Sequence, residues 1–269
     1  MTIGVVGVGL IGGSIGLACR GNSHRVIGFE PFETKTSIDR GCVDELGSLE
    51  EVSKSDIVFL CVPPSQIVEV SREVCRTKLS ATVVTDCGSI KGPIVEWLSS
   101  AGEGRYVPGH PMAGHEKSGA KFASAWMFRG AKWILTPCDF TESAAIKAVE
   151  KVVTEMGATP VRVDAERHDR EVAVLSHLPH ALAAVLVRLG GKLDSTEASA
   201  GSWKDLTRVG GVDPNLWTQI LMANRAEVAR VLAEFEAELG QLRAALETGD
   251  ESGVQAFFKE AQRAKEGKK

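Results

Sequence analysis

The sequence contains six cysteines, but no two of them are spaced as CxxC. Zinc ribbons and thioredoxin-like redox sites depend on that spacing, so the sequence argues against both classes. Several of the cysteines lie inside apolar runs, where a free thiol behaves as a small hydrophobic side chain. We therefore expect reduced thiols, no metal site and a cytoplasmic protein.

An excess of basic charge is also absent. The 269 residues include 31 Lys and Arg against 35 Asp and Glu, and the formal net charge is -4. Nucleic-acid-binding proteins normally present a basic surface, so we expect no nucleic-acid partner. The apolar fraction of 43% and the charged fraction of 25% are those of an ordinary globular protein, which excludes intrinsic disorder.

The sequence has no long uninterrupted apolar run. Its longest apolar helical stretch, residues 172–189, is broken by two histidines, a proline and an arginine, so we predict that it does not span a membrane. No basic segment precedes the first apolar residues at Ile3, and we expect no signal peptide.

Short apolar runs alternate with helix-like segments over the first 164 residues. The strand candidates are 3–7, 25–30, 57–62 and 82–86, with later candidates at 133–136 and 160–163. Near-continuous apolar strands between helices are typical of a parallel sheet covered on both faces. We predict a Rossmann-type, doubly wound, mainly parallel α/β domain over residues 1–164.

Helical patterns replace the strand signals after Asp164. One long pattern covers residues 165–189, and a break rich in Gly and Ser follows at 190–211. Across residues 214–246, apolar side chains recur every three or four positions, as on one face of a helix. We predict an all-α domain over residues 165–269, part of whose apolar stripe packs against a second copy of the chain.

Residues 7–12 read Gly-Val-Gly-Leu-Ile-Gly, a GxGxxG motif that directly follows the first predicted strand and opens a helix. In a dinucleotide-binding turn the three glycines allow a tight bend, close approach of a pyrophosphate, and close packing of helix on strand. We predict cofactor contacts at Gly7, Gly9, Leu10, Ile11 and Gly12. The alternative is a glycine-rich turn that binds nothing.

Glu30 ends the second predicted strand, 18 residues after Gly12. A carboxylate at this position accepts a hydrogen bond from a ribose 2′-hydroxyl and repels a 2′-phosphate, which favours NAD over NADP. An ordinary strand-end carboxylate is the alternative. Cys61, Val62 and Pro63 follow the third strand, and we expect them to line the nicotinamide side, because ligands of open α/β sheets bind at the carboxyl ends of strands.

A second stretch rich in Gly and Pro, residues 109–119, carries His, Glu, Lys and Ser side chains. Surface loops with so many functional groups often carry chemistry. In a hydride-transfer enzyme, His110 could accept the proton of a substrate hydroxyl while hydride leaves the same carbon. The local sequence equally allows a histidine that fixes a tight turn.

Four motifs follow one another along the chain. They are GxGLIGGS at 7–14, DxGSxK at 86–91, GHPMAGxExSG at 109–119 and SHLPH at 176–180, and residues 204–217 continue the series. Together they resemble the prephenate and arogenate dehydrogenases of tyrosine biosynthesis, from about residue 3 to about residue 245. The resemblance implies an N-terminal dinucleotide-binding domain and a C-terminal helical domain that forms a homodimer.

The resemblance also implies roles for single residues. His110 matches the catalytic histidine, and Ser89 matches a hydroxyl partner close to both substrate and nicotinamide. Arg208 matches the arginine that anchors a substrate carboxylate. The remaining matches line the substrate pocket or its mouth: Glu116, Ser118, His180, Gly201 and Trp217.

Several of these residues also have structural interpretations. Ser89 could be the N-cap of the helix that follows it. Arg208 could form a surface ion pair, and Glu116 could be a solvated loop carboxylate. Trp217 could pack in the core, and His177 is better explained by helix packing than by ligand binding.

The activity implied by the resemblance is the NAD-dependent oxidative decarboxylation of prephenate to 4-hydroxyphenylpyruvate, with His110 as general base. Substrate choice in this family has been associated with the positions of Ser118 and His180, whose pattern here favours prephenate over arogenate. A β-hydroxyacid or imine reductase would present a catalytic Lys or Asp in the helix between the domains, and residues 176–180 do not. A non-catalytic NAD sensor would have no reason to keep His110, Ser89 and Arg208 together.

Overall fold

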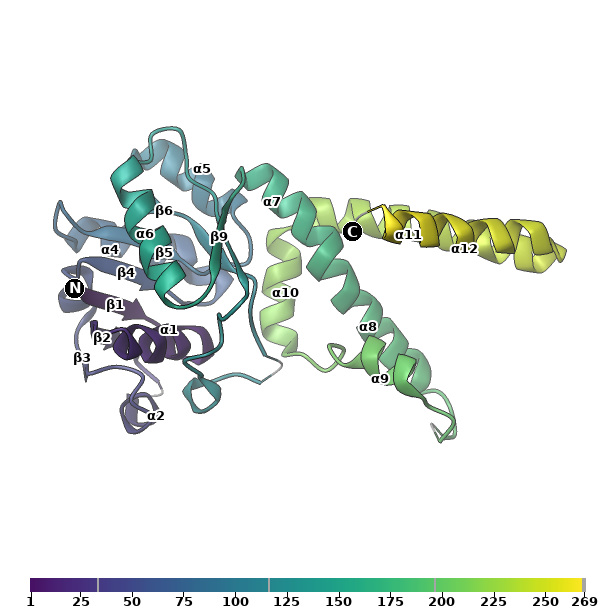
Figure 1. The fold of residues 1–269 in the computed structure, drawn as a ribbon, viewed down its shortest axis with the longest axis horizontal. Coiled ribbons are helices and arrows are strands. Elements are labelled where there is room, and N and C mark those ends of the chain that lie inside the picture. The colour runs from purple at the N-terminus through teal and green to yellow at the C-terminus, as the bar shows by residue number, and fades with distance from the viewer. Residues whose placement is uncertain (33, 116, 196, 268–269) are drawn as a thin grey trace.

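The computed structural model describes residues 1–32, 34–115, 117–195 and 197–267. One part of the molecule is built around a sheet, and the other is entirely helical. From the helical part a long pair of helices, α11 and α12, projects away from the sheet (Figure 1).

The main sheet has six strands in the order β3-β2-β1-β4-β5-β6, and all neighbouring pairs are parallel. The strands are β1 (Thr2–Val6), β2 (Arg25–Phe29), β3 (Glu45–Leu46), β4 (Ile57–Leu60), β5 (Val83–Asp86) and β6 (Tyr106–Val107). The strand order reverses between β1 and β4, as in dinucleotide-binding sheets. The predicted doubly wound α/β fold is confirmed.

Helices cover both faces of this sheet because its strands are apolar on both sides. Ile57 and Phe59 pack in one core with α1 (Leu10–Gly21) and α6 (Ser143–Glu155). Val58 and Leu60 pack in a second core. The helices that contribute to the second core are α3 (Leu49–Ser53), α4 (Ile67–Thr77) and α5 (Gly92–Ala101). The short elements α2 (Thr34–Asp39), η1 (Pro64–Gln66) and η2 (Ala120–Phe122) lie in the connections.

A second, three-stranded sheet lies beside the first, in the order β7-β8-β9. Its strands are β7 (Gly109–Pro111), β8 (Lys132–Leu135) and β9 (Thr159–Arg162). The strands predicted near residues 133–136 and 160–163 are therefore confirmed as β8 and β9, but they belong to the second sheet and do not extend the main one. The prediction of a loop from residue 109 is wrong for its first three residues, which pair antiparallel with β8.

Gly109 allows β7 to begin against the end of β5. A Cβ atom at this position would lie 2.7 Å from the carbonyl oxygen of Asp86, a distance that no side chain tolerates. The absence of a side chain therefore brings His110, the next residue, to the carboxyl end of the main sheet.

The helical part begins with one continuous helix made of α7 (Ala165–Val172), a π-helical turn η3 (Ala173–His177) and α8 (Leu178–Gly190). The helix predicted for residues 165–189 is confirmed. The remaining helices are α9 (Gly201–Thr207), α10 (Pro214–Ala223), α11 (Arg225–Thr248) and α12 (Glu251–Glu266).

The prediction of a single helix over residues 214–246 is wrong, because the helix is interrupted at Asn224, between α10 and α11. The Asn224 side chain is buried and donates a hydrogen bond of 2.8 Å to the carbonyl oxygen of Asp169. This contact with α7 holds the junction inside the core. The apolar stripe thus belongs to two helices.

By length and composition alone, the long helix Ala165–Gly190 is apolar enough to cross a membrane. This is weak evidence for a membrane span, since the core helices of globular proteins meet the same criterion. Here α7 packs on α5, and α8 packs on α9 and α11. With 22% of the most apolar 18-residue window buried, much of the helix remains exposed in a single chain.

Candidate active site

The glycine turn between β1 and α1 has the geometry of a phosphate cradle. Gly7 has a φ of +87°, and a Cβ atom there would lie 2.7 Å from the Cys61 carbonyl oxygen. A Cβ atom at Gly12 would lie 2.0 Å from the Gly7 carbonyl oxygen. Beside Gly9, in contrast, there is nothing within 4 Å of such an atom. This open space at the N-terminus of α1 fits a pyrophosphate, which the first helix amides would bind.

Glu30 lies at the edge of this turn. Its carboxylate accepts hydrogen bonds from the amide of Val8, at 2.8 Å, and from the amide of Phe32, at 2.9 Å. These bonds fix the carboxylate at the carboxyl end of β2, where the adenosine ribose of a dinucleotide lies in this fold.

Cys61, Val62 and Pro63 follow β4 directly, as predicted. The Cys61 amide donates to the Val6 carbonyl oxygen at 2.7 Å, and the Cys61 sulfur lies 3.6 Å from the sulfur of Cys87. Burial raises the pKa of the Cys87 thiol well above its ordinary value. The two cysteine side chains contact each other between the ends of β4 and β5.

A buried ion pair joins the end of β5 to β7. Lys91 and Asp86 are both fully buried, and the Lys91 ammonium contacts the Asp86 carboxylate. The same ammonium donates a hydrogen bond of 2.6 Å to the carbonyl oxygen of Gly109. Lys91 thus ties the segment that carries Ser89 to the strand that carries His110.

Ser89 is half-buried in the segment between β5 and α5. Its alternative interpretation as a helix cap is wrong, because α5 begins after Lys91 and has no side-chain cap from its own segment. The first amides of α5 are bound instead by Asp169 of α7. The Asp169 carboxylate accepts from Lys91 N at 2.9 Å and from Gly92 N at 2.8 Å.

His110 is half-buried and bonded to a second histidine. Its Nδ1 lies 2.9 Å from Nε2 of His168, and Nδ1 of His168 lies 2.7 Å from Oδ1 of Asp169. Burial, followed by the neighbouring His168 and Lys91, holds the pKa of His110 well below its usual range. His110 is therefore neutral at neutral pH.

The π-helical turn arranges the histidines of the SHLPH motif. His177 is 1% exposed, contacts Asn224 Nδ2 at 3.3 Å, and has a pKa lowered to about 4 by burial. This environment agrees with a packing role. His180 donates a hydrogen bond of 2.8 Å from Nδ1 to the Ser176 carbonyl oxygen, so Nδ1 carries a proton.

Trp217 is partly buried and packs in the core, in agreement with its structural interpretation. Its ring stacks on His180 with centroids 3.8 Å apart and planes at 23°. It also packs against a small core formed by Ile90, Val172 and Ile220. Trp217 therefore joins the helical part to the segment after β5.

The other predicted pocket residues lie at the surface. Arg208 follows α9 and is exposed, and its charge adds to burial in lowering the pKa of His180. Gly201 and Ser118 are exposed, and in the described part of the chain no hydrogen bond joins either of them to His110. Glu116 lies outside the described residues.

Sequence reasoning missed His168 and Asp169 and gave no role to Lys91. The available signals were an adjacent His-Asp pair at the start of a helix expected to join the domains, and a lysine inside the DxGSxK motif. No group of three or more potential metal ligands occurs among the described residues.

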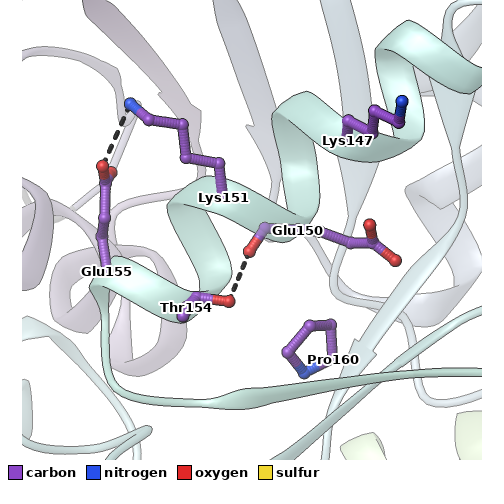
Figure 2. Close-up of a pocket in the computed structure, with 6 residues that line it drawn as sticks. All are labelled: Lys147, Glu150, Lys151, Thr154, Glu155 and Pro160. Atoms are coloured by element: carbon purple, nitrogen blue, oxygen red, sulfur yellow. Dashed lines mark hydrogen bonds and ion pairs between the residues drawn. The ribbon is translucent and has the colours of Figure 1, made fainter.

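A hollow of about 500 Å³ on the outer face of α6 is separate from this site (Figure 2). Its walls are formed by Lys147, Glu150, Lys151, Thr154, Glu155 and Pro160. Three of its four charged side chains form ion pairs within the chain: Lys151 with Glu155 at 3.0 Å, and Glu150 with Arg162 at 2.6 Å. None of the candidate site residues lines it.

A Rossmann sheet with a glycine cradle, a strand-end carboxylate and a neutral histidine facing a helical domain defines the class of nicotinamide-dependent dehydrogenases with a second helical domain. Residues 15–162 match the family model described as prephenate dehydrogenase, nucleotide-binding domain. Residues 164–260 match the one described as prephenate dehydrogenase, dimerization domain. The chain belongs to the prephenate dehydrogenase family, as its motifs predicted.

Individual relatives agree with this assignment. The chain is 30% identical to a prephenate dehydrogenase of Bacillus subtilis, over 99% of this chain and 76% of the relative. Prephenate dehydrogenase from A. aeolicus, solved in complex with hydroxyphenyl propionate and NAD+, is 30% identical, with a TM-score of 0.89 over 100% of this chain and 98% of that one. Arogenate dehydrogenase of Synechocystis is 26% identical, with a TM-score of 0.84 over 100% of both chains.

Proposed function

We propose that this chain is an NAD-dependent prephenate dehydrogenase, which converts prephenate to 4-hydroxyphenylpyruvate and CO2 in tyrosine biosynthesis. The observation that carries the proposal is the neutral His110, bonded through Nδ1 to His168 at 2.9 Å, next to the carboxyl end of a dinucleotide-binding sheet. The relatives named prephenate dehydrogenase support the reaction class.

The cofactor would lie across the carboxyl ends of β1, β2 and β4. Gly7, Gly9, Leu10, Ile11 and Gly12 form the turn for its pyrophosphate, since the space beside Gly9 is open. Glu30 would bind the adenosine ribose, and Cys61, Val62, Pro63 and Ser89 would line the nicotinamide side. When bound, NAD+ supplies the hydride acceptor.

His110 acts as the general base in this proposal. Its Nε2 atom takes the proton of the ring hydroxyl as hydride leaves the same carbon, and Ser89 orients that hydroxyl. The proton returns to the ring oxygen when the ring carboxylate departs as CO2 and the ring becomes aromatic. Arg208 holds a substrate carboxylate through its guanidinium N–H groups. His180 joins it only as the imidazolium, because the one N–H of its neutral form is already bonded to the Ser176 carbonyl oxygen.

The rest of the proposed pocket consists of Trp217, Gly201, Ser118 and Glu116. The positions of Ser118 and His180 favour prephenate. Arogenate is the second candidate substrate, and the likeness to the arogenate dehydrogenase of Synechocystis supports it. The two substrates differ in one side chain, a keto acid against an amino acid, so one assay distinguishes them.

The test is NADH or NADPH formation at 340 nm with NAD+ or NADP+, offered prephenate and then arogenate. Turnover of prephenate with NAD+ is the expected result. Turnover of arogenate alone would keep the family and overturn the substrate. No turnover of either substrate, with intact NAD binding, would overturn the enzymatic function.

The same proposal includes a homodimer formed by the helical part. Large apolar side chains are exposed there, among them Leu175 at 70%, Leu246 at 63% and Phe258 at 61%. Exposed apolar surface of this extent marks protein interfaces, and the matching family model is a dimerization domain. We also propose domains of residues 1–164 and 165–269 and, from the six free cysteines, a cytoplasmic location.

A further inference from the structure

His110, His168 and Asp169 form a linear chain of hydrogen bonds that crosses between the two parts of the molecule. His110 belongs to β7, and the other two belong to α7. The distances are 2.9 Å between the two rings and 2.7 Å from His168 Nδ1 to Asp169 Oδ1. His168 is 2% exposed, so its ring has no room to turn away from this chain.

The direction of each bond follows from Asp169. An ionised carboxylate only accepts hydrogen bonds, and this one already accepts from the amides of Lys91 and Gly92. His168 Nδ1 must therefore carry a proton and donate it to Asp169. In neutral His168 the other nitrogen, Nε2, is then an acceptor.

His110 must supply the donor for that acceptor. Its proton consequently lies on Nδ1, and its Nε2 atom carries a lone pair. Within the described part of the chain, Nε2 of His110 makes no hydrogen bond, whereas Nδ1 is occupied. The reactive nitrogen is left unprotonated and available to a substrate.

We propose that His168 and Asp169 are positioning residues that hold His110 in the tautomer whose Nε2 accepts the substrate proton. This inference rests on the proposed role of His110 as general base. Asp169 is itself held by three sets of hydrogen bonds. Its carboxylate accepts from His168 and from the first amides of α5, and its backbone carbonyl oxygen accepts from Asn224 at 2.8 Å. Three parts of the chain thus orient the His110 imidazole together: α7, the segment that follows β5, and the junction between α10 and α11.

Two variants of His168 separate positioning from packing. In His168→Gln, the side-chain oxygen can accept from His110 Nδ1 while the amide nitrogen donates to Asp169. In His168→Leu, neither bond can form. We expect His168→Leu to lower kcat about 10²- to 10⁴-fold, the range for lost general base catalysis, with KM nearly unchanged. His168→Gln should retain kcat within about tenfold of the wild type, since it preserves both bonds.

His24→Gln is the matched control, because His24 also bonds a carboxylate, Glu155, at 3.0 Å but lies outside the site. It should leave kcat unchanged. If the Gln and Leu variants of His168 lost the same activity, or if Leu raised KM without lowering kcat, a positioning role would be wrong.

A second readout does not depend on turnover. Nitrogen-15 NMR of histidine-labelled, substrate-free protein reports which ring nitrogen carries the proton. We expect His110 to be protonated on Nδ1 in the wild type and in His168→Gln, and to lose this preference in His168→Leu. A wild-type His110 protonated on Nε2 would overturn the inference. An Nδ1 proton in a protein without prephenate turnover would overturn the proposed function and leave the tautomer assignment standing.

Discussion

At the scale of single residues, the most consequential side chain outside the reacting groups is Lys91. Its ammonium is fully buried between the Asp86 carboxylate and the Gly109 carbonyl oxygen. Removing one partner of a buried pair costs more than the pair contributes, because the remaining charge is left without compensation in a medium of low polarity. The same charge also lowers the pKa of His110.

Lys91→Met is expected to lower the free energy of unfolding by about 3–5 kcal/mol. Urea denaturation at pH 7 measures this change. Lys151→Met is the control, since Lys151 pairs with Glu155 on the surface and is 60% exposed; its loss should change stability by less than about 1 kcal/mol. Equal effects of the two substitutions would contradict the buried-pair interpretation.

His110→Asn should lower kcat about 10²- to 10⁴-fold, since asparagine cannot accept the substrate proton. The base must be deprotonated to act, so kcat falls as the pH drops through the folded pKa of His110. Because that pKa lies well below its ordinary value, the acid limb of the wild type should appear well below pH 6.5. Steady-state kinetics across pH 4–8 would show it, and an acid limb centred on about pH 6.5 would contradict the prediction.

At the scale of elements, the π-helical turn buries a histidine that must remain uncharged. The pKa of His177 is about 4 in the folded chain, against about 6.5 for an unperturbed histidine. Between these two values the unfolded chain binds more protons than the folded one. Stability is therefore fully present above about pH 6.5 and declines as the pH falls toward 4.

The expected loss from this one group is about 3 kcal/mol between pH 7 and pH 4. It is measured by comparing the pH dependence of urea unfolding in the wild type and in His177→Gln, whose amide cannot be protonated in this range. The two curves should converge at low pH. Parallel curves would show that His177 is not the titrating group.

Strands were predictable where apolar residues follow one another along the chain. β1, β2, β4 and β5 each place apolar side chains on both faces of the sheet, and the sequence pattern reports that directly. β3, β6 and β7 have only two or three residues, too few for a periodic pattern. The break at Asn224 was not predictable either, because the apolar spacing continues across it and its cause is a contact with Asp169, distant in sequence.

The same distinction applies to the site. His110, Ser89 and the glycine turn lie in motifs of neighbouring residues, so the sequence could propose them as candidates. The bond between His110 and His168 joins residues 58 positions apart. Its existence depends on how α7 packs on α5, which no local pattern encodes. Residues that support a candidate site through contacts distant in sequence are therefore harder to predict than residues that lie in a local motif.

At the scale of the whole molecule, the exposed apolar surface of the helical part is the basis of the proposed dimer. The buried stripe of α11 ends with Val231, and the apolar residues beyond it are increasingly exposed, with Leu239 at 47% and Leu246 at 63%. These residues lie on the projecting α11–α12 pair (Figure 1). A second copy of the chain, packed along this pair and the exposed side of α8, would cover them.

Light scattering should give twice the 28.7 kDa mass of the chain. Leu175→Asp places a charge on the exposed side of the long helix, where Leu175 is 70% exposed, and should shift the mass toward that of one chain. Leu79→Asp, at a position 53% exposed in the α/β part, should leave the mass unchanged. A monomeric wild type would contradict the proposed dimer.

The close approach of Gly109 to Asp86 has a consequence for the order in which a reaction centre is assembled. Because β7 starts against the end of β5 and is bonded there through Lys91, His110 is held at the carboxyl end of the main sheet. In the proposed enzyme, the general base would therefore stand beside the cofactor-binding edge of the sheet before a substrate arrives. Half of the proposed reaction centre would be complete in advance, and a substrate would have only to dock against it.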